Sequence, residues 1–174
     1  MRVRIVWRRG DAAFLYPIPP APRTAVLIPG FRAGGAVRVF AGGWSGEVAE
    51  FAPQAIAGTL KQMEAIAATK ISVSHALVII SLFEDVRLTG VDRENLWTRF
   101  GVPVFEQVIG EDGKLLAAEC EAHCGLHLRA RIGPSVWERL RGSGGIDESP
   151  CACGRTTPRL METQRLKTMG ATSR

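Results

Sequence analysis

The chain has 174 residues, of which 46% are hydrophobic and 22% charged, and this composition is typical of a globular protein rather than a disordered one. It contains no run of eighteen or more apolar residues, which argues against a membrane-spanning helix. The net charge of +5 is concentrated at the two ends, since residues 1–32 carry +5, residues 33–154 carry −4 and residues 155–174 carry +4.

The N-terminal part alternates and then becomes rich in proline. Apolar and arginine residues alternate over residues 1–9, which predicts an edge strand. Four prolines in residues 16–23 predict an extended linker, and two short apolar strands follow at 24–29 and 36–40. The first apolar stretch is too short for a signal peptide. We therefore expect a cytoplasmic protein whose cysteines are thiols or metal ligands rather than disulfides.

The central part contains one predicted helix and one ambiguous apolar run. Glycines at 42–46 invite a phosphate-loop interpretation, but the lysine of that signature is missing and a plain turn explains them. Apolar residues recur at helical spacing from Pro53 to Ala67, which predicts a helix. Residues 71–83 alternate and then become apolar except for Ser81, so strand and helix both stay open. His75 falls on the apolar side, where we expect a hydrogen-bonded core residue.

A short helix and a hairpin are predicted next. The helix covers residues 91–100, with Asp92 as its cap, Trp97 facing the core and Gly101 as the stop signal. Two apolar strands, 104–109 and 114–119, flank a Gly-Glu-Asp-Gly turn, which indicates a hairpin. We predict a single α/β (or α+β) domain over residues 1–159, with a mixed sheet, flanking helices and a zinc-knuckle-like C-terminal part.

All four cysteines and two of the three histidines lie in two short segments between residues 119 and 154. Zinc takes four thiolate or imidazole ligands in a tetrahedron, commonly two from each of two short turns. The set that we favour from spacing is Cys120, Cys124, Cys151 and Cys153, and in a variant His127 replaces one cysteine.

Other interpretations of these cysteines stay open. Unliganded buried thiols are the plainest alternative. A redox pair or an iron–sulfur cluster fits less well, because the spacing C-x-x-C is absent and a histidine follows Cys124 where a third cysteine would be needed. A catalytic zinc would need an open coordination position and a general base, for which Glu119 and Glu121 are the candidates.

Three short motifs resemble the phenylacetate–CoA ligase type of adenylate-forming enzyme. They are FGVPVFE at 100–106, ECEAH at 119–123 with GLHL at 125–128, and CACGRT at 151–156. The resemblance covers about residues 80–160 and implies an α/β arrangement with a retained cysteine cluster. ATP-dependent activation of a carboxylic acid with Mg²⁺ follows only under the alternative in which the chain is itself a ligase. The family's aromatic-Gly-x-Thr-Glu motif is missing between residues 107 and 118. The family's ATP loop and its catalytic lysine are missing as well.

The function expected from the sequence is therefore a zinc-binding α/β domain, non-catalytic or accessory, that resembles part of an acyl-CoA ligase core. An active or degenerate ligase is the first alternative, with residues 110–113 as a reduced nucleotide loop and Arg155 near the substrate. An interaction module is the second, in which the flexible basic tail, residues 160–174, contacts an acidic partner. Aromatic residues are 7% and do not interleave with basic ones, so no dedicated nucleic-acid motif is present.

Overall fold

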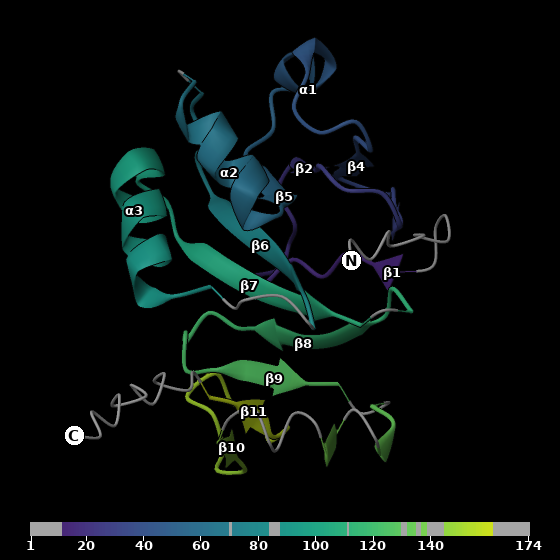
Figure 1. Ribbon diagram of the computed structural model, residues 1–174, viewed down its shortest axis with the longest axis vertical. Helices are drawn as coiled ribbons and strands as arrows, with labels where there is room; N and C mark the ends of the chain where they lie inside the picture. The colour runs from purple at the N-terminus through teal and green to yellow at the C-terminus, as the bar shows by residue number, and fades with distance from the viewer. Residues whose placement is uncertain are drawn as a thin grey trace, which may run out of the picture.

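The computed structural model describes residues 12–69, 71–83, 88–110, 112–129, 132–134, 137–138 and 145–161 (Figure 1). Within these ranges the chain is a single mixed α/β domain, as predicted from the sequence. Its main sheet has nine strands in the order β10-β11-β9-β8-β7-β6-β5-β2-β4. The strand predicted at residues 1–9 lies outside the described residues, and so does the predicted basic tail from residue 162 onward.

One half of the main sheet is parallel and forms the centre of the fold. Its strands are β2 (Thr24–Val26), β4 (Val37–Val39), β5 (Ala55–Gly58), β6 (Ala76–Leu82) and β7 (Val104–Ile109). β5 and β7 are buried at every residue, and β6 at all but its last. Strands covered on both faces read as continuous apolar runs, and this explains the sequence of β6, in which Ser81 is the one polar residue. A separate small sheet pairs β1 (Ala12–Ala13) with β3 (Phe31–Arg32) in parallel.

The other half of the sheet is antiparallel and carries the cysteine segments. Its strands are β8 (Leu115–Glu119), β9 (Leu126–Leu128), β10 (Ile146–Asp147) and β11 (Arg159–Leu160). They extend the sheet at the end opposite to helix α1 (Figure 1). The predicted hairpin is confirmed, because β7 and β8 pair as neighbours on either side of its turn. Leu160 belongs to the sheet and is 1% exposed.

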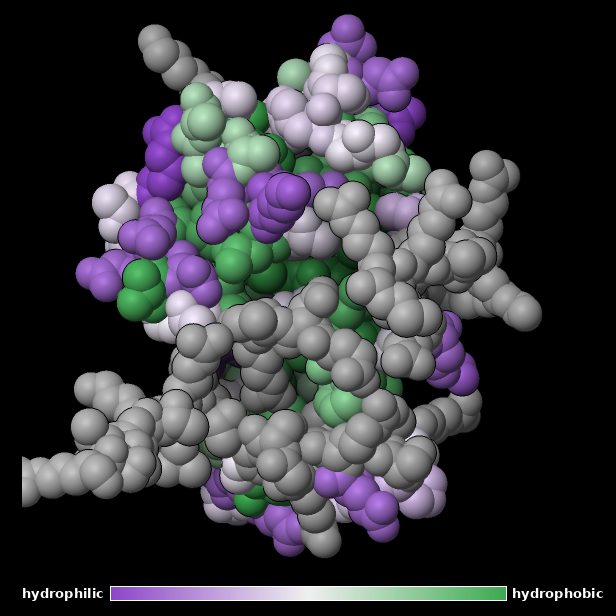
Figure 2. Space-filling model, in the orientation of Figure 1, coloured by the Kyte–Doolittle hydropathy of each residue, from purple (hydrophilic) through white to green (hydrophobic). Residues whose placement is uncertain are grey.

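The helices α1 (Gly46–Phe51), α2 (Leu60–Ala67) and α3 (Gly90–Phe100) pack on one face of the parallel half. Val48, Met63 and Leu96, one from each helix, join a single buried cluster with residues of β2, β5 and β6. Figure 2 shows hydrophilic side chains over α2 and α3, and hydrophobic ones in the middle of this face, where β6 and β7 run. The opposite strand face packs against the N-terminal aromatic residues Phe14 and Phe31.

The helix predicted from Pro53 is wrong in its first part. Residues Ala55–Gly58 form β5, which pairs in parallel with β2 on one side and β6 on the other. The helix begins only after Thr59, whose hydroxyl accepts a bond from the Gln62 N–H while the Gln62 side chain accepts from the Thr59 N–H. Ile56 falls by coincidence on the helical repeat of α2. The apolar pattern therefore predicted a helix over residues that form a strand.

Two further side chains differ from expectation. His75 is exposed and precedes β6 instead of lying in it, and its ring contacts the Ser74 hydroxyl at 2.9 Å. Trp97 is 55% exposed, because it follows Leu96 and therefore points about 100° away from the face that Leu96 buries. The helix itself is confirmed and ends at Gly101, whose φ is 68°. Its N-cap, however, is Thr89 and not Asp92, which is the third helical residue and completes a capping box with Thr89. No helix among the described residues has the length and apolar character needed to span a bilayer.

Candidate metal centre

Two tight turns present the cysteines from neighbouring antiparallel strands. β8 delivers the chain to Cys120, where the His123 N–H donates to the Cys120 carbonyl at 3.1 Å and the chain then returns as β9. The second turn lies between β10 and β11, where the Gly154 N–H donates to the Cys151 carbonyl at 2.9 Å. Because β11 pairs directly with β9, the two turns end beside each other.

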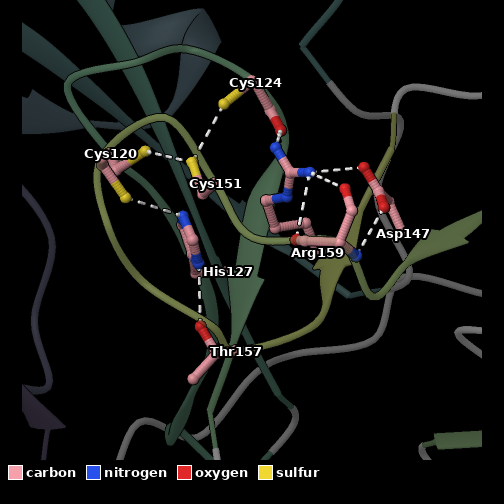
Figure 3. Close-up of polar contacts among 9 residues, drawn as sticks. Cys120, Cys124, His127, Asp147, Cys151, Thr157 and Arg159 are labelled. Atoms are coloured by element: carbon pink, nitrogen blue, oxygen red, sulfur yellow. Dashed lines mark hydrogen bonds and ion pairs between the residues drawn. The ribbon is translucent and has the colours of Figure 1, made fainter.

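Four potential ligand atoms gather between these turns. The Sγ atoms of Cys120, Cys151 and Cys153 and one ring nitrogen of His127 all lie within 4.8 Å of one another (Figure 3). All of these residues except Cys153 are buried. Three thiols and one imidazole are a donor set that zinc uses in structural sites. This group could hold a metal ion such as zinc.

The separations within the group suit tetrahedral zinc. Bond lengths of about 2.3 Å to sulfur and about 2.0 Å to nitrogen place two sulfurs about 3.8 Å apart and a sulfur and a nitrogen about 3.5 Å apart. The Sγ atoms of Cys120 and Cys151 are 3.7 Å apart, and the Cys153 Sγ lies 3.4 Å from the His127 Nε2. These two separations thus already match a tetrahedral site, and the others are at most 4.8 Å.

The orientation of His127 is set by a neighbouring hydroxyl. Its Nδ1 lies 2.8 Å from the Thr157 Oγ1, while its Nε2 faces the cysteines. If Nδ1–H donates to Thr157, the Nε2 lone pair is free for a metal, and this is the usual arrangement behind a histidine ligand. Thr157 is not evident from the sequence, because an isolated threonine in a loop carries no signal until its partner is known.

Cys124 stands apart from this group, although spacing favoured it as a ligand. Its Sγ lies 3.0 Å from the Cys151 Sγ, which is shorter than the separation of about 3.8 Å expected for two sulfurs on one zinc ion. The set that the structure brings together is the variant with His127 in place of Cys124. Pairing explains it: His127 is opposite Ala118 on β8, two residues before Cys120, so strand alternation directs both side chains to one face.

The thiols of the cluster differ strongly in acidity. Burial raises the pKa of Cys120 to about 12. Burial also acts to raise the pKa of Cys151, but hydrogen bonds from Cys124 and Cys153 outweigh it and lower that pKa to about 5. A cluster of thiols cannot ionise together without a cation, so one thiolate forms first and its neighbours donate to it.

A buried arginine ties the two turns together (Figure 3). Arg159, on β11, is 5% exposed and donates through Nη1 to the Cys124 carbonyl at 2.9 Å. Its Nη2 pairs with the Asp147 carboxylate and donates to the Ser149 Oγ at 3.1 Å. The guanidinium fork can hold these acceptors at once because its donors diverge in one plane. In the sequence, Arg159 stands out only as a residue that follows the third motif.

A pocket of about 660 Å³ lies on the other side of the first turn. Its lining includes Arg93, Glu106, Glu119 and Cys124. Glu119 is buried and engaged: Arg93 Nη1 lies 3.0 Å and His123 Nδ1 3.2 Å from its oxygens, and the Glu106 N–H donates to it at 2.9 Å. The general base considered for a catalytic metal is thus held by three partners.

Glu121, the other candidate base, is exposed and lies 3.8 Å from Arg155. Glu119 also faces away from the metal ligands, since it pairs with Leu126 while His127 pairs with Ala118. Neither carboxylate belongs to the group of metal-ligating atoms.

Comparison of the chain with protein-family models and with curated proteins finds no match.

Proposed function

We propose that this chain is a zinc-binding α/β domain in which the metal has a structural role. The observation that carries the proposal is the group of Cys120, His127, Cys151 and Cys153, whose ligand atoms lie within 4.8 Å of one another. Three thiolates and one imidazole match the preference of zinc over magnesium or calcium, which take oxygen ligands.

The proposed role is structural because four protein ligands complete the coordination of the ion. A catalytic zinc keeps one position for water or substrate, and here that position is taken. Zinc would join the β8–β9 turn to the β10–β11 turn, at the end of the sheet where the strands have only two or three residues. Such short strands gain little from their own ladder, so a metal link contributes to folding directly.

Metal analysis of the full-length protein tests this function. We expect one zinc ion per chain by mass spectrometry, and a large fall in the thermal unfolding midpoint when a strong chelator removes it. His127→Ala should lose most of the bound zinc, whereas the matched control His75→Ala, at an exposed histidine outside the cluster, should keep it. Metal-free protein with four freely titrating thiols and an unchanged midpoint in chelator would refute the proposal.

A second candidate function, an adenylate-forming acid–CoA ligase or a degenerate relative, is favoured by one observation. The pocket of about 660 Å³ is lined by residues from two of the three motifs that resemble that family, namely Val104 and Glu106 from the first and Glu119 and Leu126 from the second. These two motifs, which the β7–β8 hairpin makes neighbours, thus line one cavity large enough for a small ligand.

Thermal unfolding with ATP and Mg²⁺ tests this alternative. A nucleotide that binds the folded state raises the midpoint by mass action. A midpoint that does not move at millimolar ATP would exclude the ligase function for this chain, and it would leave the zinc proposal unaffected.

A further inference from the structure

Cys124 is the one cysteine among the described residues that lies outside the proposed ligand group, yet its sulfur is closer to the sulfur of Cys151 than that of the ligand Cys120 is. Its Sγ is 3.0 Å from the Cys151 Sγ, while the Cys120 Sγ is 3.7 Å from the same atom. The sulfurs of a disulfide are about 2.05 Å apart, so Cys124 and Cys151 would need to approach by about 1 Å to become bonded. Figure 3 shows the two thiols facing each other from the two turns.

Cys124 is also the cysteine of this pair that a dissolved reagent can reach. It is half-buried and lines the pocket of about 660 Å³, whereas Cys151 is 5% exposed and Cys120 is fully buried. Oxidation of cysteine by small peroxides follows exposure as well as ionisation. Cys153 is half-buried too, but none of the four proposed ligands lines this pocket. A peroxide that enters the pocket therefore meets Cys124 before it meets the ligands.

The backbone that follows the Cys124 side chain is held in place. Arg159 donates to the Cys124 carbonyl at 2.9 Å, and the next residue, Gly125, has a φ of 99°. A Cβ on Gly125 would lie 3.0 Å from the Leu160 carbonyl oxygen, so this turn is packed closely against β11. The thiol is thus presented to Cys151 by a turn with little freedom to withdraw.

We propose that Cys124 is an oxidation site, at which a hydroperoxide converts Cys124 and Cys151 into a disulfide and thereby releases the metal. This inference rests on the proposed zinc site. It assigns Cys124 a role distinct from that of a ligand.

The chemistry takes two steps. The Cys124 thiol gives up its proton and the resulting thiolate attacks one oxygen of hydrogen peroxide, so that the O–O bond breaks and hydroxide leaves. The hydroxide takes up the released proton, and the products are a sulfenic acid on Cys124 and one water molecule. The Cys151 thiolate then attacks the Cys124 sulfur, the S–O bond breaks, and hydroxide leaves. Over the two steps each sulfur is oxidised by one electron, and each of the two peroxide oxygens is reduced by one electron.

The disulfide removes one of the four ligands from the metal. Cys120, His127 and Cys153 remain, and three protein ligands hold zinc more weakly than a closed set of four. A thiol reductant would break the disulfide and restore the site. Metal occupancy would then follow the redox state of the surroundings.

The first test maps the disulfide in zinc-loaded protein after treatment with hydrogen peroxide. Cleavage at arginine and glutamate separates Cys120 from Cys124, because Glu121 lies between them, and fragmentation at Ala152 separates Cys151 from Cys153. We expect a link between Cys124 and Cys151. A link from Cys120 to either cysteine of the second turn would overturn the proposal.

The second test follows zinc release with a coloured chelator in wild type and in Cys124→Ser. The variant should bind zinc as tightly as wild type but release it under peroxide on the order of ten times more slowly, because the accessible thiol that starts the reaction is gone. Equal release rates would overturn the proposal, and so would weaker zinc binding by the variant, since that would make Cys124 a ligand.

These outcomes separate the inference from the function on which it rests. Zinc content before oxidation reports on the metal site alone, and disulfide mapping of metal-free protein reports on the cysteine pair alone. Wild-type protein that holds zinc but forms no bond between Cys124 and Cys151 would refute the proposed oxidation site and leave the proposed zinc site unaffected.

Discussion

The hydroxyl of Thr157 offers a sharp test of how the metal centre is built. Its Oγ1 lies 2.8 Å from the Nδ1 of His127, on the side of the ring away from the cysteines. Thr157→Val keeps the shape of the side chain and removes only the hydroxyl. The imidazole then loses the acceptor that sets its tautomer and orientation, so zinc should bind less tightly.

The size of the effect follows from the exposure of Thr157. Loss of a partner behind a histidine ligand typically lowers metal affinity 10- to 100-fold. Thr157 is exposed, so water can replace part of the lost hydrogen bond, and we expect the lower end of this range. A loss of about ten-fold corresponds to about 1.4 kcal/mol.

Competition with a chromophoric chelator at fixed pH measures this difference. Thr156→Val is the matched control, because it makes the same change at the preceding exposed threonine and leaves the bond to His127 intact. We expect wild-type affinity from the control. If Thr157→Val also binds zinc with the wild-type Kd, His127 is not oriented by this hydroxyl and the assignment of Nε2 to the metal loses its support.

Three further predictions concern the turns and their protonation. Replacing the buried Arg159 with leucine should lower the free energy of unfolding by about 2–3 kcal/mol in urea denaturation. The control is Arg155→Ala, at a half-exposed ion pair whose charged atoms are 3.8 Å apart, and it should change this free energy by less than about 0.5 kcal/mol. Equal effects would contradict the role of Arg159 in joining the two turns. Gly125→Ala should destabilise the protein by at least about 1 kcal/mol more than Gly154→Ala, because both glycines have positive φ but only at Gly125 would a Cβ lie 3.0 Å from a backbone oxygen. Zinc affinity should rise with pH by about ten-fold per unit for each proton released. The reason is that Cys120, with a pKa of about 12, is protonated at neutral pH and must ionise to bind the metal. A zinc affinity that stays constant from pH 6 to pH 8 would exclude Cys120 as a ligand.

Local signals in the sequence were sufficient for several elements of the fold. The helix before Gly101 and the hairpin around residues 110–113 were predicted correctly, because caps and turns depend on residues only a few positions apart. The strand Ala55–Gly58 was predicted as helix, since its apolar residues also satisfy a helical repeat. Its state was decided by β2 and β6, which supply backbone partners on both sides and which no local pattern reveals.

The same division holds for the metal centre. Residue types and clustering alone determined that two short segments carry thiols and imidazoles suited to zinc, because ligand chemistry belongs to the side chains themselves. Which four of them meet was a matter of tertiary structure. The pairing of β8 with β9 places His127 on the same face as Cys120, and the pairing of β9 with β11 brings Cys151 and Cys153 alongside. The spacing of residues along the chain does not say which face of a strand a side chain is on or which strands pair. It could therefore not separate Cys124 from the residues that form the group.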